Sequence, residues 1–232
     1  MARRLFFVPQ VHSGQAELRG DEAKHLSRVL RVEVGQVFEI SDNQQKYLAK
    51  VADAHKELVR FEILEKLSAH RELPVIHLYA AIIKFEHFEW GIEKATELGV
   101  DRIIPVQTAR SEPGLERAVT KRLERWRRIA LESSQQCRRA FIPELSEVMR
   151  FRDVAAKAEG QRIFLDENRA GLTIGKLAKA EDAISVLIGP EGGWTEDERS
   201  LAATQNWVSA SLGPRVLRAE TAWLATLAIL RA

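Results

Sequence analysis

Two glycine-containing segments combine residue types suited to binding a ligand at the end of a strand. The first is VLIGPEGGWTEDE, residues 186–198, in which the loop 189–193 separates an apolar run from a helix start at Thr195 and Glu198. That pair has the capping-box pattern of a helix N-terminus. Glycines allow a backbone to approach a ligand closely and to present its N–H groups without obstruction. The segment is thus a candidate ligand-binding loop, the alternative being a plain turn.

The second segment is SLGPRVLRAETA, residues 211–222, and it has the same character. An apolar run ends at Gly213 and Pro214, and Arg215, Arg218 and Glu220 then lead into an apolar helix. In an open α/β sheet, ligands bind beyond the carboxyl ends of the strands, where both loops are expected to lie. Two such loops in one domain are harder to explain as turns than one alone.

Short elements fill the first part of the chain. Apolar and alternating runs predict a helix from Asp21 to Leu30 and strands at Leu5–Val8, Val37–Ser41, Tyr47–Val51 and Leu58–Leu64. Strands of this length and spacing indicate a small β-barrel or sandwich, which we assign to residues 1–70. The polar stretch Ser68–Pro74 is expected to link it to a second domain.

Residues 74–232 alternate between strand and helix patterns, which predicts an α/β domain with a mostly parallel sheet. The predicted helices are Phe88–Leu98, Leu115–Cys137 and Ala219–Arg231, and the predicted strands are Val75–Ile83, Arg102–Val106, Arg162–Asp166, Ile184–Ile188 and Val208–Leu212. The last helix is apolar nearly all round, so it must be buried in the core or in a subunit interface.

The net charge of +2 conceals a basic segment. Residues 102–152 contain twelve lysines and arginines against six acidic residues, a local balance of +6. The planar guanidinium of arginine suits bidentate contacts to phosphate, so a polyanionic partner such as RNA is one interpretation. A solvated helix face with internal Glu–Arg pairs is the other, and Glu124 and Arg128 have the i,i+4 spacing of such a pair.

Several classes of protein are excluded by what the sequence lacks. Cys137 is the single cysteine, so an internal disulfide framework is impossible and no cysteine–histidine zinc site is expected. The sequence has no triphosphate-binding P-loop, no dinucleotide-binding GxGxxG after a strand, and no GxSxG of a hydrolase. No apolar run approaches a membrane span or a signal-peptide core. We therefore expect a cytoplasmic protein without membrane or metal partners.

The two loop sequences together resemble a known signature. IGPEGG (188–193) and LGPRVLRAETA (212–222) are similar to motifs of the RsmE family, bacterial methyltransferases of the SPOUT superfamily that act on N3 of a uridine in small-subunit ribosomal RNA. Nearly the whole chain shares the resemblance, through RLFFV (4–8), HLSRVLRVEVGQ (25–36), IEKATELGVDRIIPV (92–106) and RWRRIALESSQQCRR (125–139). Trp194 and Gln36 stand where phenylalanine and aspartate are common, and neither change touches the expected cofactor contacts.

The resemblance implies a fold, a cofactor and an assembly. It implies a PUA-like RNA-binding barrel followed by an α/β domain whose last segment threads a trefoil knot. S-adenosylmethionine would bind in that knot, with its adenine held by backbone groups of the two loops. The corresponding residues are Leu187, Ile188, Gly189, Pro190, Glu191, Gly192, Gly193, Leu212, Gly213, Val216 and Leu217. The family is also dimeric, which suits the apolar last helix as part of an isologous homodimer interface.

Methylation of uridine N3 requires loss of a weakly acidic proton and stabilisation of the resulting anion. We expect catalysis to rest on positioning and on cations near the uracil oxygens, with Arg215 and Arg218 as first candidates. Glu191 and Glu220 are further candidates for orienting donors or accepting the proton, with loop structure and helix capping as their alternative roles. The expected contacts to 16S ribosomal RNA, naked or in the small subunit, are Arg4, Arg28, Arg31, Arg138 and Arg139.

Other functions are compatible with the same residues. A SPOUT methyltransferase acting on a different RNA or atom would carry the same loops, because the loops bind the methyl donor and do not define the acceptor. A non-enzymatic RNA-binding assembly factor has no need of intact glycine loops, and failure to bind S-adenosylmethionine would favour it. A small-molecule enzyme fits the basic helix and the small barrel least.

Overall fold

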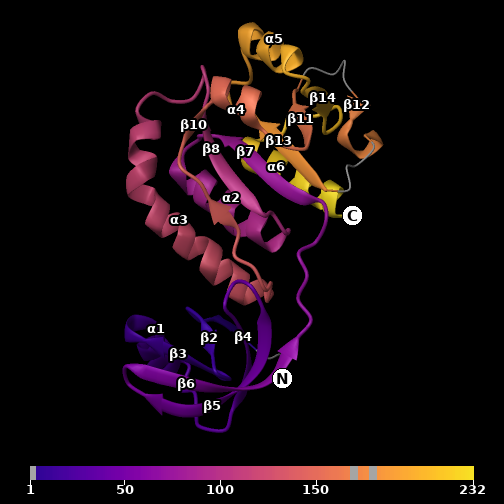
Figure 1. Ribbon diagram of the computed structural model, residues 1–232. Helices are drawn as coiled ribbons and strands as arrows, with labels where there is room; N and C mark the ends of the chain where they lie inside the picture. Colours follow the sequence, from indigo (N-terminus) through magenta and orange to yellow (C-terminus); the bar gives the residue numbers. More distant parts are fainter. Residues whose placement is uncertain (1–3, 168–171, 178–181) are drawn as a thin grey trace. The chain divides into compact units, whose positions relative to one another are not determined.

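The computed structural model describes residues 4–167, 172–177 and 182–232 of the chain. These residues form two compact units, and Figure 1 labels most of their elements. The first unit comprises the described residues up to Arg71 together with Ser134–Ile142, and the second comprises those of Glu72–Ser133 and Pro143–Ala232. No helix within the described ranges is long and apolar enough to cross a membrane.

The first unit is built on a six-stranded mixed sheet with the order β1-β4-β5-β6-β3-β2. The strands are β1 (Leu5–Phe7), β2 (Val11–His12), β3 (Gln15–Arg19), β4 (Val37–Ser41), β5 (Lys46–His55) and β6 (Leu58–Leu67). β1 pairs with β4 in parallel, and the other neighbouring pairs are antiparallel. The predicted helix at Asp21–Leu30 is a short α-helix, α1 (Gly20–Lys24), that continues into a π-helical turn over His25–Val29.

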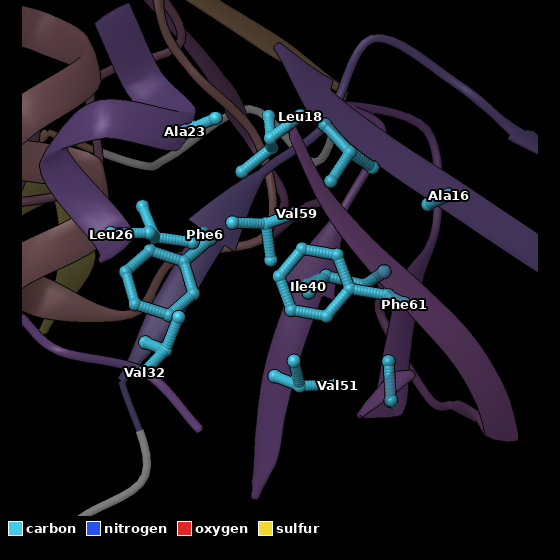
Figure 2. Packing of buried hydrophobic residues seen from close by; sticks show 12 residues of the cluster. Phe6, Ala16, Leu18, Ala23, Leu26, Val32, Ile40, Val51, Val59 and Phe61 are labelled. Atoms are coloured by element: carbon cyan, nitrogen blue, oxygen red, sulfur yellow. The ribbon is translucent and has the colours of Figure 1, made fainter. Parts of the chain in front are cut away.

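Alternating strand positions supply the core of the first unit. Ile40 of β4, Val51 of β5 and Phe61 of β6 are fully buried and belong to one hydrophobic cluster. Figure 2 shows Phe6 of β1 and Leu26 of the π-helical turn in the same interior. Each fully buried side chain of this size contributes roughly 1.5–3 kcal/mol, so the alternation fixes which strand face points inward.

Residues 134–142 pack on the first unit although they lie far along the chain. Ser41 Oγ donates a hydrogen bond to the Ala140 carbonyl oxygen at 2.6 Å, and the Ile142 backbone N–H donates to Asn43 Oδ1 at 2.8 Å. Arg138 Nη2 forms an ion pair with the buried carboxylate of Glu39, which Lys46 Nζ also approaches at 2.6 Å. These contacts make the segment part of the first unit.

The second unit contains an eight-stranded sheet in which every pair is parallel, in the order β10-β8-β7-β13-β11-β14-β12 with β9 beside β8. This confirms the predicted α/β class. The strands are β7 (Val75–Ala81), β8 (Arg102–Gln107), β9 (Glu144–Leu145), β10 (Met149–Arg150), β11 (Gln161–Leu165), β12 (Leu172–Thr173), β13 (Ala183–Ile188) and β14 (Val208–Ser211). The helices are α2 (Phe85–Glu97), α3 (Leu115–Cys137, whose residues from Ser134 on belong to the first unit), α4 (Phe151–Lys157), a 3₁₀ turn (Ile174–Lys176), α5 (Glu196–Thr204) and α6 (Ala219–Arg231).

Two groups of helices bury the sheet of the second unit. Helices α4 and α5 pack with Tyr79, Phe164 and Leu187 of the strands in one core cluster. A second, aromatic cluster joins α2, α3 and α6, where the Phe88 ring stacks on Trp126 at 4.4 Å and meets Trp223 edge-on at 4.9 Å. The buried face of α6 therefore packs in the core of its own chain, which was one of the two predicted locations, the other being a subunit interface.

Candidate active site

Both predicted loops and the end of a third strand line one cavity of about 190 Å³. The strands concerned are adjacent and parallel in the order β13-β11-β14, so their carboxyl ends meet at one edge of the sheet. The lining residues are Leu165, Asp166, Glu167, Ile188, Gly189, Pro190, Glu191, Gly192, Gly193, Trp194, Leu212, Gly213, Arg215, Val216, Leu217, Ala219 and Ala222. The geometry is the one in which open α/β sheets bind ligands.

The first loop is fixed where it enters α5. Thr195 and Glu198 form the predicted capping box, with the Glu198 backbone N–H donating to Thr195 Oγ1 at 3.3 Å and the Thr195 N–H donating to Glu198 Oε2 at 3.0 Å. Gly193 has a φ of +67°, a conformation that favours glycine, and its N–H donates to the Pro190 carbonyl at 2.9 Å. Arg110 Nη1 donates to the Gly192 carbonyl at 2.7 Å.

Trp194 anchors this loop to the sheet. Its side chain is buried, and its Nε1–H donates to the Leu165 carbonyl oxygen at 2.7 Å. The ring lies 4.7 Å from the Phe164 ring, centroid to centroid. A Cβ added at Gly189 would lie 2.9 Å from Trp194 Cε2, so the glycine is required there by the packing of the indole ring. The indole Nε1–H thus gives this position a buried hydrogen bond that a phenylalanine could not make.

The end of β11 forms a third wall, which the sequence interpretation missed. Asp166 and Glu167 follow this strand, and Arg199 of α5 binds both carboxylates. Arg199 Nε and Nη2 lie 2.7 and 3.0 Å from the two oxygens of the buried Asp166, and this hydrogen bonding raises the pKa of Arg199. The available signal was the predicted strand Arg162–Asp166, whose carboxyl end had to lie beside the two loops.

The second loop brings cations to the cavity. Gly213 has a φ of +109°, and Arg215 lines the cavity two residues later. Arg218 is the residue before α6 and makes no side-chain capping bond. Both arginines are exposed, and within the described ranges neither guanidinium forms an ion pair. Two unpaired positive charges therefore lie at or next to the cavity.

All of the predicted cofactor residues except Leu187 line the cavity. Leu187 lies in β13 and packs inside the core. Of the four predicted catalytic residues, Arg215 and Glu191 line it. Glu220 is buried and turned toward α2, where its Oε1 lies 3.3 Å from Nδ1 of His87. Ala219 and Ala222 of α6 line the cavity. Glu220 points away from them in the first turn of the helix, and it is therefore not a lining residue.

The five arginines expected to contact RNA all belong to the first unit. Arg4, Arg28 and Arg31 are exposed, whereas Arg138 pairs with Glu39 and Arg139 is half-buried. On the basic helix α3, part of the positive charge is neutralised by Glu–Arg pairs, as the alternative to an RNA-binding face predicted. Its residues Arg122 and Arg125 pair with Glu89 of α2, and Arg128 pairs with Glu132 one turn along.

Comparison with known proteins identifies the family. An RNA methyltransferase domain model matches residues 71–231, and an RNA methyltransferase PUA domain model matches residues 18–64. The ribosomal RNA small subunit methyltransferase E of Aquifex aeolicus is 31% identical, over 97% of this chain and 98% of that protein. Its counterpart in Synechocystis is 32% identical, over 100% of this chain and 78% of that protein.

Solved structures agree with this result. The ribosomal RNA small subunit methyltransferase E of Neisseria gonorrhoeae, bound to S-adenosylmethionine, superposes with a TM-score of 0.89 at 30% identity, covering 97% of this chain and 95% of that one. A putative methyltransferase of Legionella pneumophila in complex with the same cofactor gives 0.87 at 29% identity, covering 99% and 97%. The chain therefore belongs to the family of ribosomal RNA small subunit methyltransferase E, the RsmE family whose motifs its two loops carry.

Proposed function

We propose that this protein transfers a methyl group from S-adenosylmethionine to N3 of one uridine in 16S ribosomal RNA of the small subunit. The observation that carries the proposal is the cavity on which both family loops converge, with the unpaired cation Arg215 in its lining. The names of the relatives support the choice of small-subunit ribosomal RNA as substrate. The uridine N3 acceptor is what the family resemblance implies.

The residues of the cavity suit this cofactor. Gly189, Gly192, Gly193 and Gly213 leave backbone groups accessible along two of its walls. Leu212, Val216 and Leu217 supply apolar surface for an adenine ring, and the carboxylates of Glu167 and Glu191 suit a cationic ligand. When bound there, S-adenosylmethionine supplies a methyl group activated by its sulfonium charge. We assign Ile188–Gly193, Leu212, Gly213, Val216 and Leu217 to its binding, and Leu187 to the packing beneath them.

The protein's own part in the reaction is to orient the uracil ring and to favour its N3 anion. The N3 proton leaves, a carbon–nitrogen bond forms as the carbon–sulfur bond breaks, and S-adenosylhomocysteine, 3-methyluridine and a proton result. Positive charge next to O2 and O4 of the uracil stabilises the anion in the transition state. We assign this role to Arg215 and Arg218, and we assign proton transfer to Glu191, which lines the cavity and is exposed. Glu220 pairs with His87 outside the cavity lining, so we assign it a structural role at the start of α6.

Two broader features complete the proposal. The first unit, of which residues 18–64 match the PUA model, would bind the ribosomal RNA through Arg4, Arg28 and Arg31. Arg138 would act there mainly by holding residues 134–142 on that unit through Glu39, and Arg139 is kept as a proposed RNA contact. The active protein would be a homodimer working in the cytoplasm, where its ribosomal substrate is made.

A substitution at Arg218 tests the assignment of the cations. Arg218→Ala is expected to lower single-turnover methyl transfer to unmodified small subunits by about a hundredfold, because one charge next to the developing anion is lost. Titration calorimetry should show an unchanged dissociation constant for S-adenosylmethionine. Arg152→Ala is the matched control, because Arg152 is an exposed arginine of α4 outside the cavity lining. Wild-type turnover of Arg218→Ala would remove this residue from the mechanism.

A further inference from the structure

A carboxylate outside both loops lines the cavity and is bound by an arginine of the protein. Glu167 follows β11, lines the cavity and is 44% exposed. Its Oε1 accepts a hydrogen bond from Arg199 Nη2 at 3.2 Å. In the part of the chain that the structure describes, no group donates a hydrogen bond to its second oxygen, Oε2. Among the described residues, one oxygen is thus bound by Arg199, and the other has no donor and is left for a ligand to bind.

The first loop is shaped around this carboxylate. A Cβ added at Gly193 would collide with Glu167 Oε1, so any other residue at position 193 would displace the carboxyl group. The Glu167 side chain therefore lies directly against the last glycine of the first loop. This contact gives Gly193 a second role, separate from its positive φ.

Arg199, which holds Glu167, is itself immobilised. Its guanidinium binds both oxygens of Asp166, whose side chain is only 6% exposed, and its Nη1 donates to the Trp194 carbonyl at 2.9 Å. A flexible surface ion pair would lose its geometry to solvent and contribute little. Here Arg199 is anchored by the buried Asp166, so it offers Glu167 a fixed partner and reduces the ordering entropy that a ligand binding to this carboxylate must pay.

We infer that Glu167 binds the ribose hydroxyl groups of S-adenosylmethionine, with Arg199 as the positioning residue. The inference rests on the proposed function. If the two loops hold the adenine, the group covalently next to it is the ribose, and Glu167 stands against the end of one of those loops. Two vicinal hydroxyls are donors that match a carboxylate oxygen. In dinucleotide-binding folds an acidic residue likewise binds a ribose hydroxyl, which shows that this pairing of groups is effective.

Glu167→Gln tests the inference, because it keeps the shape of the side chain and removes the charge. Affinity is measured by calorimetry for S-adenosylmethionine and for 5′-methylthioadenosine, which has the ribose but neither the ammonium nor the sulfonium. We expect both ligands to bind about tenfold more weakly, because the hydroxyl groups would then donate to a neutral amide oxygen in place of a charged carboxylate. Glu196→Gln is the matched control, since Glu196 also approaches Arg199, at 3.9 Å, but is 85% exposed and outside the cavity lining. Its affinities should equal those of the wild type.

The outcomes separate the possible contacts. A loss for S-adenosylmethionine with unchanged binding of methylthioadenosine would move Glu167 to the ammonium or sulfonium and overturn the ribose assignment. Unchanged affinity for both would overturn the inference altogether. Neither result touches the proposed function, which fails only if the wild-type protein does not bind S-adenosylmethionine.

The positioning role of Arg199 is tested by combining substitutions. Arg199→Lys keeps the charge but cannot bind Asp166 with two nitrogens while reaching Glu167. If Arg199 acts through Glu167, Glu167→Gln should weaken ligand binding by less than about threefold in the Arg199→Lys background, compared with about tenfold in the wild-type background. A full tenfold effect in both backgrounds would show that Arg199 serves stability alone.

Discussion

Replacing Gly189 by alanine is the perturbation whose effect follows most directly from the packing of the loop. The new Cβ would lie 2.9 Å from Cε2 and 3.1 Å from Nε1 of Trp194, whereas ordinary van der Waals contact begins near 3.4 Å. The indole ring must withdraw by about half an ångström or the loop must move. The ring is enclosed by Phe151 and Phe164, and its Nε1 is hydrogen-bonded to the Leu165 carbonyl.

The expected cost combines two terms. Overpacking a core in this way costs typically 1–3 kcal/mol. Weakening the buried Nε1–H bond adds roughly 0.5–1.5 kcal/mol. We therefore expect Gly189→Ala to lower the free energy of unfolding by about 2 to 3 kcal/mol, and to weaken cofactor binding because the cavity wall shifts.

Urea denaturation measures this loss, and the same loop provides the control. A Cβ at Gly192 would have side-chain atoms of Arg110 as its nearest neighbours, the first at 3.3 Å, in an exposed position. Gly192→Ala should therefore cost below about 1 kcal/mol. In a Trp194→Phe background the penalty of Gly189→Ala should shrink, because the hydrogen bond is already lost. Equal stability of Gly189→Ala and Gly192→Ala would refute the argument from the indole ring.

Two further predictions concern the rest of the fold. Arg231→Ala should destabilise the second unit by about 3 kcal/mol, because Arg231 Nη2 lies 2.7 Å from the buried carboxylate of Asp101; a loss below about 1 kcal/mol in urea denaturation would contradict this. Burial raises the pKa of Glu39, but hydrogen bonds from Lys46 and Arg138 outweigh it, so its pKa lies below the ordinary 4.5. The ionised carboxylate thus stabilises the protein fully above pH 4.5, and this stabilisation is lost as the pH falls through the lowered pKa. In urea denaturation, the stability advantage of the wild type over Glu39→Gln should therefore vanish on acidification. An advantage that stays constant from about pH 7 to about pH 3 would contradict this prediction.

The long and strongly apolar elements could be predicted from the sequence. Leu115–Cys137 and Ala219–Arg231 have the predicted bounds, and β13 differs from its prediction by one residue. Each has a pattern that only one secondary structure satisfies. By contrast, α4 and the strands β2, β3, β9, β10 and β12 were not predicted, because they are short and none has the apolar pattern that marks the predicted strands. The trefoil knot is expected from the family resemblance alone, since periodicity says nothing of how a chain is threaded.

The two loops could be placed at the site, but the third wall could not. Glycine and proline mark the two loops in the sequence, whereas Glu167 is an ordinary acidic residue whose role depends on the order of the strands in the sheet. That order puts β11 between β13 and β14, an arrangement that long-range packing decides. Glu220 shows the same limit: the rotation of α6 turns it toward His87, and the helix pattern alone did not fix that rotation.

The central claim is tested most directly by methyl transfer from labelled S-adenosylmethionine to small ribosomal subunits that lack the modification. The RNA is then digested and its nucleosides are identified by mass. The account predicts 3-methyluridine as the labelled nucleoside. A different methylated nucleoside would contradict the proposed acceptor atom while leaving the cofactor site intact. An absence of transfer to both subunits and naked ribosomal RNA would contradict the proposed reaction as a whole.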